Sequence, residues 1–161
     1  IESPDRVNDE LPFYERYWYY FWSTEPTCIL PQLYVGSAKN ASDFESIQRN
    51  KFSLIVNATT EIENFFEKRD DIQYWTVPLD DSKDGSIESV EVCFKETIKK
   101  IKEAIDNNNV VLCHCFMGAS RSVAVICGYL ITFENMTFDE AYTFIQEKRK
   151  CAAINENFKR W

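Results

Sequence analysis

The chain has 161 residues, of which 45% are hydrophobic and 27% are charged, and its formal net charge is −8. This length fits one ordinary domain with its own core, and the composition excludes a disordered or fibrous chain. The acidic balance, without any basic run, argues against nucleic acid and against an anionic membrane as partners. An anionic substrate would therefore have to be attracted by a local site.

Six cysteines are spread along the chain, at positions 28, 93, 113, 115, 127 and 151. Several stand inside apolar runs such as Val110–Cys115, which is typical of free thiols in a reducing compartment rather than of a disulfide framework. The longest apolar run, Val123–Phe133, is too short to span a bilayer, and no signal peptide is evident. We therefore expect a soluble protein of the cytoplasm, with the nucleus as a further location.

An aromatic-rich extension, residues 1–26, precedes the main domain, which we place at residues 27–161. Within it, Phe13–Trp22 contains only two charged side chains, Glu15 and Arg16. We expect this segment to be a helix with apolar residues on nearly every face. Such a surface must be covered by the domain itself or by another molecule, and we predict a homodimer with Phe13–Trp22 in the interface.

The first part of the main domain reads as short strands with one helix between them. Residues 27–36 hold two strand-like pieces around Pro31. Ser42–Glu45 has the form of a capping box, so a helix should follow it. Ser53–Ala58 reads as a buried strand and Gln73–Val77 as another.

The second part alternates long helices with one more strand. Asp80–Ser86 is polar and contains a glycine, so we expect a loop. Beyond it, apolar residues recur every three or four positions, which predicts a long amphipathic helix. The residues that form this pattern are Val90, Phe94, Ile98, Ile101 and Ile105.

An apolar strand should follow at Val110–Cys113, then a buried helix at Ser122–Phe133. Thr137–Glu140 is a second capping box that opens a last helix. This alternation predicts an α/β fold with a mainly parallel sheet of about five strands, flanked by helices on both faces. In such folds the chemistry lies at the carboxyl ends of the strands.

The end of the strand at Val110–Cys113 carries the most informative segment, His114–Ser122, which reads HCFMGASRS. A thiolate at a helix N-terminus beside a cation is favoured well below the ordinary cysteine pKa of ~8.5. The loop that leads into the helix can point several backbone N–H groups inward as an anion nest. Gly118 permits the tight turn, and the planar fork of Arg121 fits two phosphoryl oxygens at once.

A metal is the competing interpretation of Cys113, His114 and Cys115. Structural zinc sites need four ligands and space the paired ligands by two to four residues, and His114 is the only histidine of the chain. We expect no metal, and we expect the other five cysteines to be small buried hydrophobic residues.

The loop resembles the Cys-x5-Arg-Ser/Thr signature of the protein tyrosine phosphatases, and within them the dual-specificity branch. Four further segments are similar to that branch: its opening strand pair, its next strand, its general-acid loop and its closing segment. They are Leu30–Ser37, Ile55–Thr59, Val77–Ser82, and Arg149 with Asn155 and Phe158. The resemblance implies the protein-tyrosine-phosphatase-like fold over residues 27–158.

The resemblance also implies a role for each residue of the loop. Cys115 would be the nucleophile, and Ser122 would assist its departure from the thiophosphate intermediate. His114 would orient the loop through hydrogen bonds. The phosphoryl group would be held by six residues: Phe116, Met117, Gly118, Ala119, Ser120 and Arg121.

The general acid falls in the loop at Asp80–Ser86. The alignment of Pro78–Asp81 with the family pattern assigns the role to Asp81, and Asp80 and Asp84 remain competitors because the stretch between this loop and the strand is slightly longer than usual. Poxvirus-like members of the family dimerise through an N-terminal helix, and Phe13–Trp22 is similar to it in position.

The implied function is a metal-independent protein phosphatase without a cofactor. It would act on phosphorylated proteins, at phosphotyrosine and at phosphoserine or phosphothreonine, because no segment resembles the loop that deepens a tyrosine-specific pocket. One alternative is a phosphoprotein-binding module with little turnover, and another is a sulfur-transfer or arsenate-reducing enzyme with the same loop.

Overall fold

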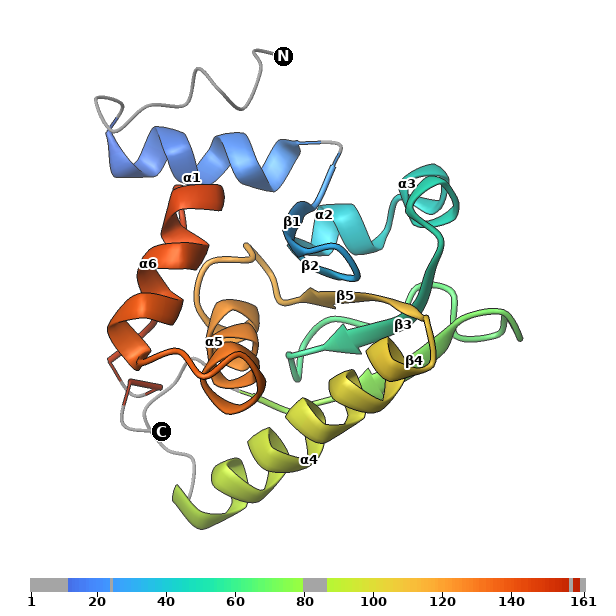
Figure 1. The fold of residues 1–161 in the computed structure, drawn as a ribbon. Coiled ribbons are helices and arrows are strands. Elements are labelled where there is room, and N and C mark those ends of the chain that lie inside the picture. The colour runs from blue at the N-terminus through green and yellow to red at the C-terminus, as the bar shows by residue number, and fades with distance from the viewer. Residues whose placement is uncertain (1–11, 24, 80–86, 157, 160–161) are drawn as a thin grey trace.

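The computed structural model describes residues 12–23, 25–79, 87–156 and 158–159 (Figure 1). A five-stranded sheet stands at the centre, in the order β1-β2-β5-β3-β4. The strands are β1 (Thr27–Leu30), β2 (Leu33–Gly36), β3 (Phe52–Asn57), β4 (Gln73–Thr76) and β5 (Val110–His114). Only β1 and β2 pair antiparallel, and the other three pairings are parallel. The prediction of a mainly parallel sheet is therefore confirmed.

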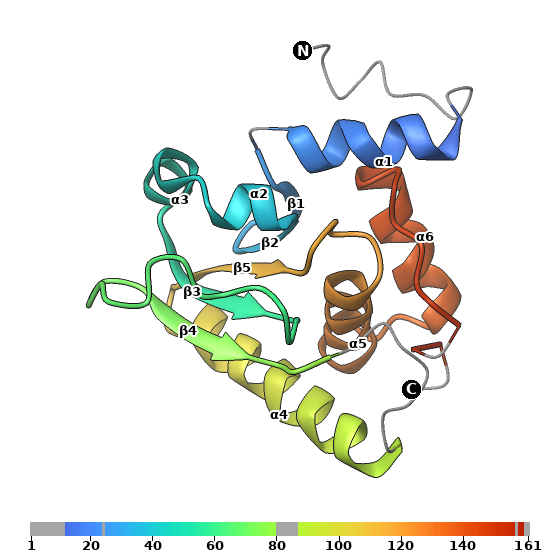
Figure 2. The same ribbon diagram turned by 180° about the vertical axis from the view of Figure 1, so that it is seen from behind.

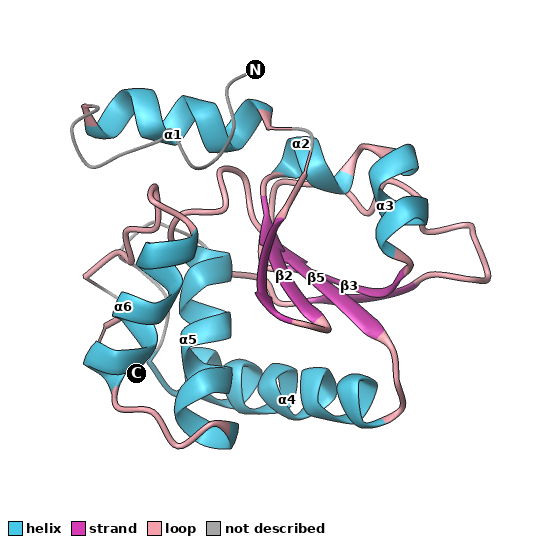
Figure 3. Cartoon of the chain, turned by 45° about the horizontal axis from the view of Figure 1, so that its top comes forward, coloured by secondary structure: helices cyan, strands magenta, loops and turns pink. Residues whose placement is uncertain are grey.

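Helices cover both faces of the sheet, as the sequence predicts. On one side lie α4 (Ile87–Asp106), α5 (Arg121–Phe133) and α6 (Phe138–Lys148), and on the other lie α2 (Ala38–Ala41) and α3 (Phe44–Asn50) (Figure 3). α1 (Phe13–Trp22) lies across one end of the molecule. The loop that follows β5 turns toward this same end (Figures 1 and 2).

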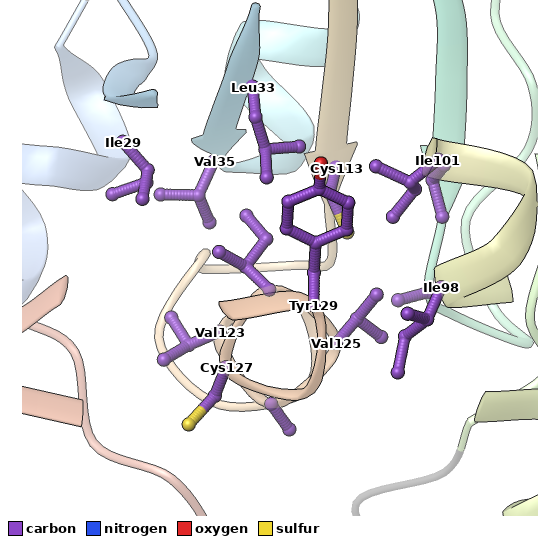
Figure 4. Packing of buried hydrophobic residues seen from close by; sticks show 14 of the residues in the cluster. Ile29, Leu33, Val35, Ile98, Ile101, Cys113, Val123, Val125, Cys127 and Tyr129 are labelled. Carbon is purple, nitrogen blue, oxygen red and sulfur yellow. The ribbon is translucent and has the colours of Figure 1, made fainter. Parts of the chain in front are cut away.

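Burial on both faces explains why the central strands read as continuous apolar runs. In β5, Val111 and Cys113 join the large core beneath α4 and α5, whereas Leu112 joins the smaller core beneath α3. This alternation is the two-residue period of a strand. Figure 4 shows Val123, Cys127 and Tyr129 of α5 among the buried side chains of the larger core.

Helix starts agree with the predictions to within a residue or two. Thr137 caps α6, and its hydroxyl accepts a hydrogen bond from Glu140 N. The capping box at Ser42–Glu45 is wrong in detail, because Asp43 is the N-cap of α3 and accepts from Ser46 N. Both residue types make good caps, so composition alone does not fix which one is used.

Two further features differ from the prediction or lie beyond it. The single-turn helix α2 was not predicted, and it is stabilised by a capping box between Ser37 and Asn40. The predicted loop Asp80–Ser86 lies outside the described residues, and so do the side chains of residues 80–90. Within the described ranges, no helix combines the length and the apolar character that a membrane crossing requires.

Candidate active site

The nucleophile candidate lies where the central strand β5 ends. β5 is flanked by β2 and β3, and all three run parallel, so their carboxyl ends meet at one edge of the sheet. A loop of six residues, Cys115–Ser120, connects β5 to the first residue of α5, Arg121. We call these six residues the phosphate loop, after the role that the resemblance predicts for them.

The sulfur of Cys115 lies inside this loop. Cys115 is only 3% exposed, and its Sγ accepts a hydrogen bond from Gly118 N at 3.2 Å. Ser122 Oγ lies 3.2 Å from the same sulfur. One backbone amide and one hydroxyl therefore face the sulfur.

Each carbonyl oxygen from Cys115 to Ala119 accepts a hydrogen bond from a donor that lies outside the phosphate loop. The five pairs are Cys115 O with His114 Nδ1, Phe116 O with Ala38 N, Met117 O with Arg149 Nη2, Gly118 O with Arg149 Nε, and Ala119 O with Ala153 N. A trans peptide holds its C=O and its N–H on opposite sides. The amides that follow these carbonyls therefore face the other way, as the bond from Gly118 N to Cys115 Sγ shows for one of them, and this is the arrangement expected of an anion nest.

Gly118 occupies a position that no other residue type fits. Its φ is +72°, in the left-handed region. A Cβ added there would stand 2.5 Å from Arg149 Nη2 and 2.6 Å from Gly36 O. The second contact is with backbone, which cannot swing away, so the tight turn needs glycine for its conformation and for its space.

Arg121 stands at the first position of α5 and is almost fully buried. Its Nη2 donates to Glu61 Oε1 at 2.5 Å and its Nη1 to Glu61 Oε2 at 2.8 Å. Nη1 also donates to Leu79 O at 3.2 Å. Three hydrogen bonds thus hold the guanidinium in place.

Glu61 is a member of this site that the sequence analysis missed. It lies shortly beyond the end of β3, and its side chain is 48% exposed. The hydrogen bonds from Arg121 lower the pKa of its carboxyl to about 2, against a smaller opposing effect of burial. An acidic residue after the strand next to β5 was a usable signal, because adjacent parallel strands end at the same edge.

His114 is fully buried, and its ring is held in one tautomer. Nδ1 lies 3.1 Å from the carbonyl oxygen of Cys115, which can only accept, so Nδ1 carries the proton. Burial lowers the pKa of His114 to about 4, so the ring is neutral at pH 7. The orienting role of His114 stays a prediction, and this contact is the one through which the ring would act on the loop.

The acid candidates Asp80, Asp81 and Asp84 lie outside the described residues. The described chain reaches Leu79, whose carbonyl accepts the hydrogen bond from Arg121. The described chain ahead of the three aspartates therefore ends beside Arg121. In the part of the chain that the structure describes, no cluster of three or more histidine, cysteine, aspartate or glutamate side chains has the arrangement of a metal site.

The comparisons with known proteins identify the family. The model of the dual specificity phosphatase catalytic domain matches residues 33–161. The chain belongs to this family, and so to the dual-specificity branch of the cysteine-dependent protein tyrosine phosphatases. Its class is that of a dual-specificity protein phosphatase.

Curated relatives agree with this assignment. The chain is 36% identical over 133 residues to Dual specificity protein phosphatase 9 of Homo sapiens, a match that covers 83% of this chain and 34% of that protein. It is 34% identical over 134 residues to Protein phosphatase Slingshot of Drosophila melanogaster, which covers 83% of this chain and 12% of that protein. The chain thus spans 34% and 12% of the length of these two relatives.

Solved structures share the fold. DUSP15 matches with a TM-score of 0.74 and 27% identity, covering 86% of this chain and 85% of that chain. Human DUSP28 matches with a TM-score of 0.76 and 22% identity, covering 84% and 88%. The human tyrosine phosphatase-like serine/threonine/tyrosine-interacting protein matches with a TM-score of 0.75 and 23% identity, covering 86% and 93%. The last two likenesses show the fold alone.

Proposed function

We propose that this chain removes phosphate from phosphotyrosine and from phosphoserine or phosphothreonine in proteins, through a cysteinyl-phosphate intermediate on Cys115. The observation that carries the proposal is the Cys115 sulfur bonded by Gly118 N inside a loop whose carbonyls bond outward, with the buried Arg121 directly after that loop. Three phosphoryl oxygens carry the charge of the transition state, and these donors are suited to stabilise it.

In the first step the Cys115 thiolate attacks phosphorus, the S–P bond forms and the P–O bond to the substrate breaks. Asp81 donates a proton to the departing oxygen, in line with general acid catalysis. In the second step water attacks phosphorus, Asp81 takes a proton from it, and the S–P bond breaks. Ser122 Oγ, 3.2 Å from the sulfur, would donate to the thiolate as it leaves.

Asp81 is assigned by the family pattern, with Asp80 and Asp84 as competitors. The hydrogen bond of Leu79 O to Arg121 supports an acid from this segment. Substituting each aspartate by Asn distinguishes the three. Loss of the acid should impair phosphotyrosine far more than para-nitrophenyl phosphate, whose leaving group needs little protonation, and should remove the basic limb of the pH–rate profile.

Hydrolysis of para-nitrophenyl phosphate without added metal tests the activity directly. Cys115→Ser should abolish turnover and retain phosphopeptide binding, because a hydroxyl is a much weaker nucleophile than a thiolate. Arg121→Ala should weaken both. Turnover by Cys115→Ser above a few per cent of wild type would refute the mechanism.

The competing function is phosphoprotein binding with little turnover. We consider it because the chain shares its fold with the tyrosine phosphatase-like interacting protein. The two differ in one measurement. A binding module would retain phosphopeptides and release no phosphate, whereas the proposed enzyme releases it with Cys115, Arg121 and Asp81 all intact. Phosphorylated proteins are the proposed partners in either case, and the cytoplasm is the proposed location.

We also propose that α1 joins two copies of the chain. Its residues Tyr14, Trp18 and Trp22 are spaced by four and are more than half exposed, whereas Tyr20 is buried on the opposite face. Aromatic residues are common interface anchors. Light scattering at micromolar concentration should show a dimer mass for wild type and a monomer mass for Trp18→Glu, and a wild-type monomer would refute this proposal.

A further inference from the structure

Arg149 is a buried cation that the mechanism does not use. It follows the last residue of α6, and none of its surface is exposed. Within the described ranges no carboxylate forms an ion pair with it. Its donors go to neutral oxygens instead: Nε to Gly118 O at 2.7 Å, Nη2 to Met117 O at 3.1 Å and Nη1 to Thr27 Oγ1 at 2.8 Å.

Two of these three oxygens belong to consecutive peptides of the phosphate loop. The peptide that joins Met117 to Gly118 presents its oxygen to Arg149 and its N–H to Cys115 Sγ. The next peptide presents its oxygen to Arg149 Nε, so the N–H of Ala119 points to the opposite side. One guanidinium therefore sets the direction of two amides of the nest.

Arg149 is itself held by the N-terminal segment. The ring of Tyr20 in α1 lies 5.0 Å from the guanidinium carbon, within the range of a cation–π contact. Tyr20 is buried together with Met117, Ala119 and Cys151. Thr27, the third acceptor, is the first residue of β1.

The end of α1 is fixed to the domain by two further bonds. Ser37 Oγ donates to Phe21 O at 3.1 Å, and Asn40 Nδ2 donates to Ser23 O at 2.8 Å. Both donors belong to the capping box of α2, whose first residue, Ala38, also donates to Phe116 O of the phosphate loop. The N-terminal helix and the phosphate loop thus share the same supports.

We propose that Arg149 is a positioning residue that orients the amides of the phosphate loop, and that α1 keeps it in place through Tyr20. This inference rests on the proposed function of the loop as a phosphate site. Arg149 touches neither the substrate nor Cys115 in this role, because it acts on the outer side of the loop. α1, which lies ahead of the range that the family model matches, then belongs to the phosphate-binding machinery.

Three variants test the proposal at different distances from the loop. Arg149→Lys keeps the charge but cannot reach two carbonyls and Thr27 together. Tyr20→Leu removes the ring face and keeps an apolar side chain, with Tyr20→Phe as its matched control. Thr27→Val removes one acceptor at nearly constant volume. Leu130→Ala, in the core and away from the loop, controls for lost stability.

The readout is the affinity for inorganic phosphate, measured by calorimetry in a Cys115→Ser background and as the competitive inhibition constant in the active enzyme. We expect Arg149→Lys to weaken phosphate binding by about tenfold, since a hydrogen bond from a charged donor is lost. Tyr20→Leu and Thr27→Val should weaken it severalfold and raise KM in parallel. Tyr20→Phe, which keeps the ring face, should weaken phosphate binding less than Tyr20→Leu does, and Leu130→Ala should bind phosphate as wild type does.

The proposal is overturned if folded Tyr20→Leu, Thr27→Val and Arg149→Lys all bind phosphate as tightly as wild type. It is also overturned if Leu130→Ala weakens binding to the same degree, because the effect would then follow stability alone. Should Arg149→Lys not fold, the variants of Tyr20 and Thr27 decide. If wild type binds phosphate but does not hydrolyse para-nitrophenyl phosphate, the proposed function is contradicted. The comparison of phosphate affinity among the variants still decides the role of Arg149 in that case.

Discussion

Acidification should destabilise the fold through His114, the only histidine of the chain. Burial lowers its pKa from 6.5 to about 4. Each pKa unit corresponds to about 1.4 kcal/mol, so this difference corresponds to about 3 kcal/mol of stability. That is a large part of the total for a domain of this size.

The sign follows from which state binds the proton. Between pH 6.5 and pH 4 the unfolded chain protonates this imidazole and the native state does not, so acid favours unfolding. The contribution is fully present above pH 6.5, declines as the pH falls, and is lost below pH 4. It adds to the ordinary effect of the carboxylates.

Denaturant unfolding of wild type and of His114→Asn at a series of pH values isolates this contribution. The asparagine amide can take the place of Nδ1–H, and it does not titrate. The stability difference between the two proteins should shrink by about 3 kcal/mol between pH 7.5 and pH 4. A native imidazole signal in the NMR spectrum with a midpoint near 6.5, or equal pH slopes for both proteins, would refute the reasoning.

Two other substitutions test the loop and the arginine. Gly118→Ala places a Cβ 2.6 Å from Gly36 O at φ +72°, so the loop must shift. We expect kcat/KM for para-nitrophenyl phosphate to fall by about a hundredfold, because misplacement of catalytic groups by an ångström commonly causes such a loss. Near wild-type kinetics would contradict the steric conflict assigned to this position. Glu61→Gln keeps an acceptor for Arg121 and removes the charge of the carboxylate. We expect kcat/KM to fall by about fivefold, which corresponds to the ~1 kcal/mol of a half-exposed ion pair. An increase in kcat/KM would show instead that Glu61 competes with phosphate for Arg121. Because the pKa of Glu61 is lowered to about 2, its contribution to stability should be present above its unfolded pKa and lost as the pH falls toward 2, and the Gln variant should lack that loss in acid unfolding curves.

The sequence predicts the sheet and the phosphate loop because the signals for both are local. Apolar runs buried on both faces define β3 and β5, and the loop between β5 and α5 is one continuous segment of fixed residue types. The two supports of the loop are not local. Glu61 reaches Arg121 across sixty residues and Arg149 reaches Gly118 across thirty-one, and neither contact leaves a periodicity in the sequence.

The N-terminal helix shows a further limit of pattern reading. Composition indicates that Phe13–Trp22 must be covered, but it does not separate the face that meets the domain from the face that meets solvent. That division depends on where Arg149 lies, because the buried Tyr20 packs on its guanidinium. A buried arginine is itself rarely expected from sequence, since charged side chains are mostly exposed.

The two arginines explain how a chain of net charge −8 can present a site for a phosphate dianion. Arg121 is paired with Glu61, so part of its charge is compensated before substrate binds. Arg149 is bonded to carbonyl and hydroxyl oxygens, which do not cancel its charge. The amides that Arg149 orients and the N-terminus of α5 add positive potential on the same side of the sheet edge. If the loop binds phosphate as proposed, its attraction for the anion therefore depends on Arg149 behind the loop as well as on Arg121.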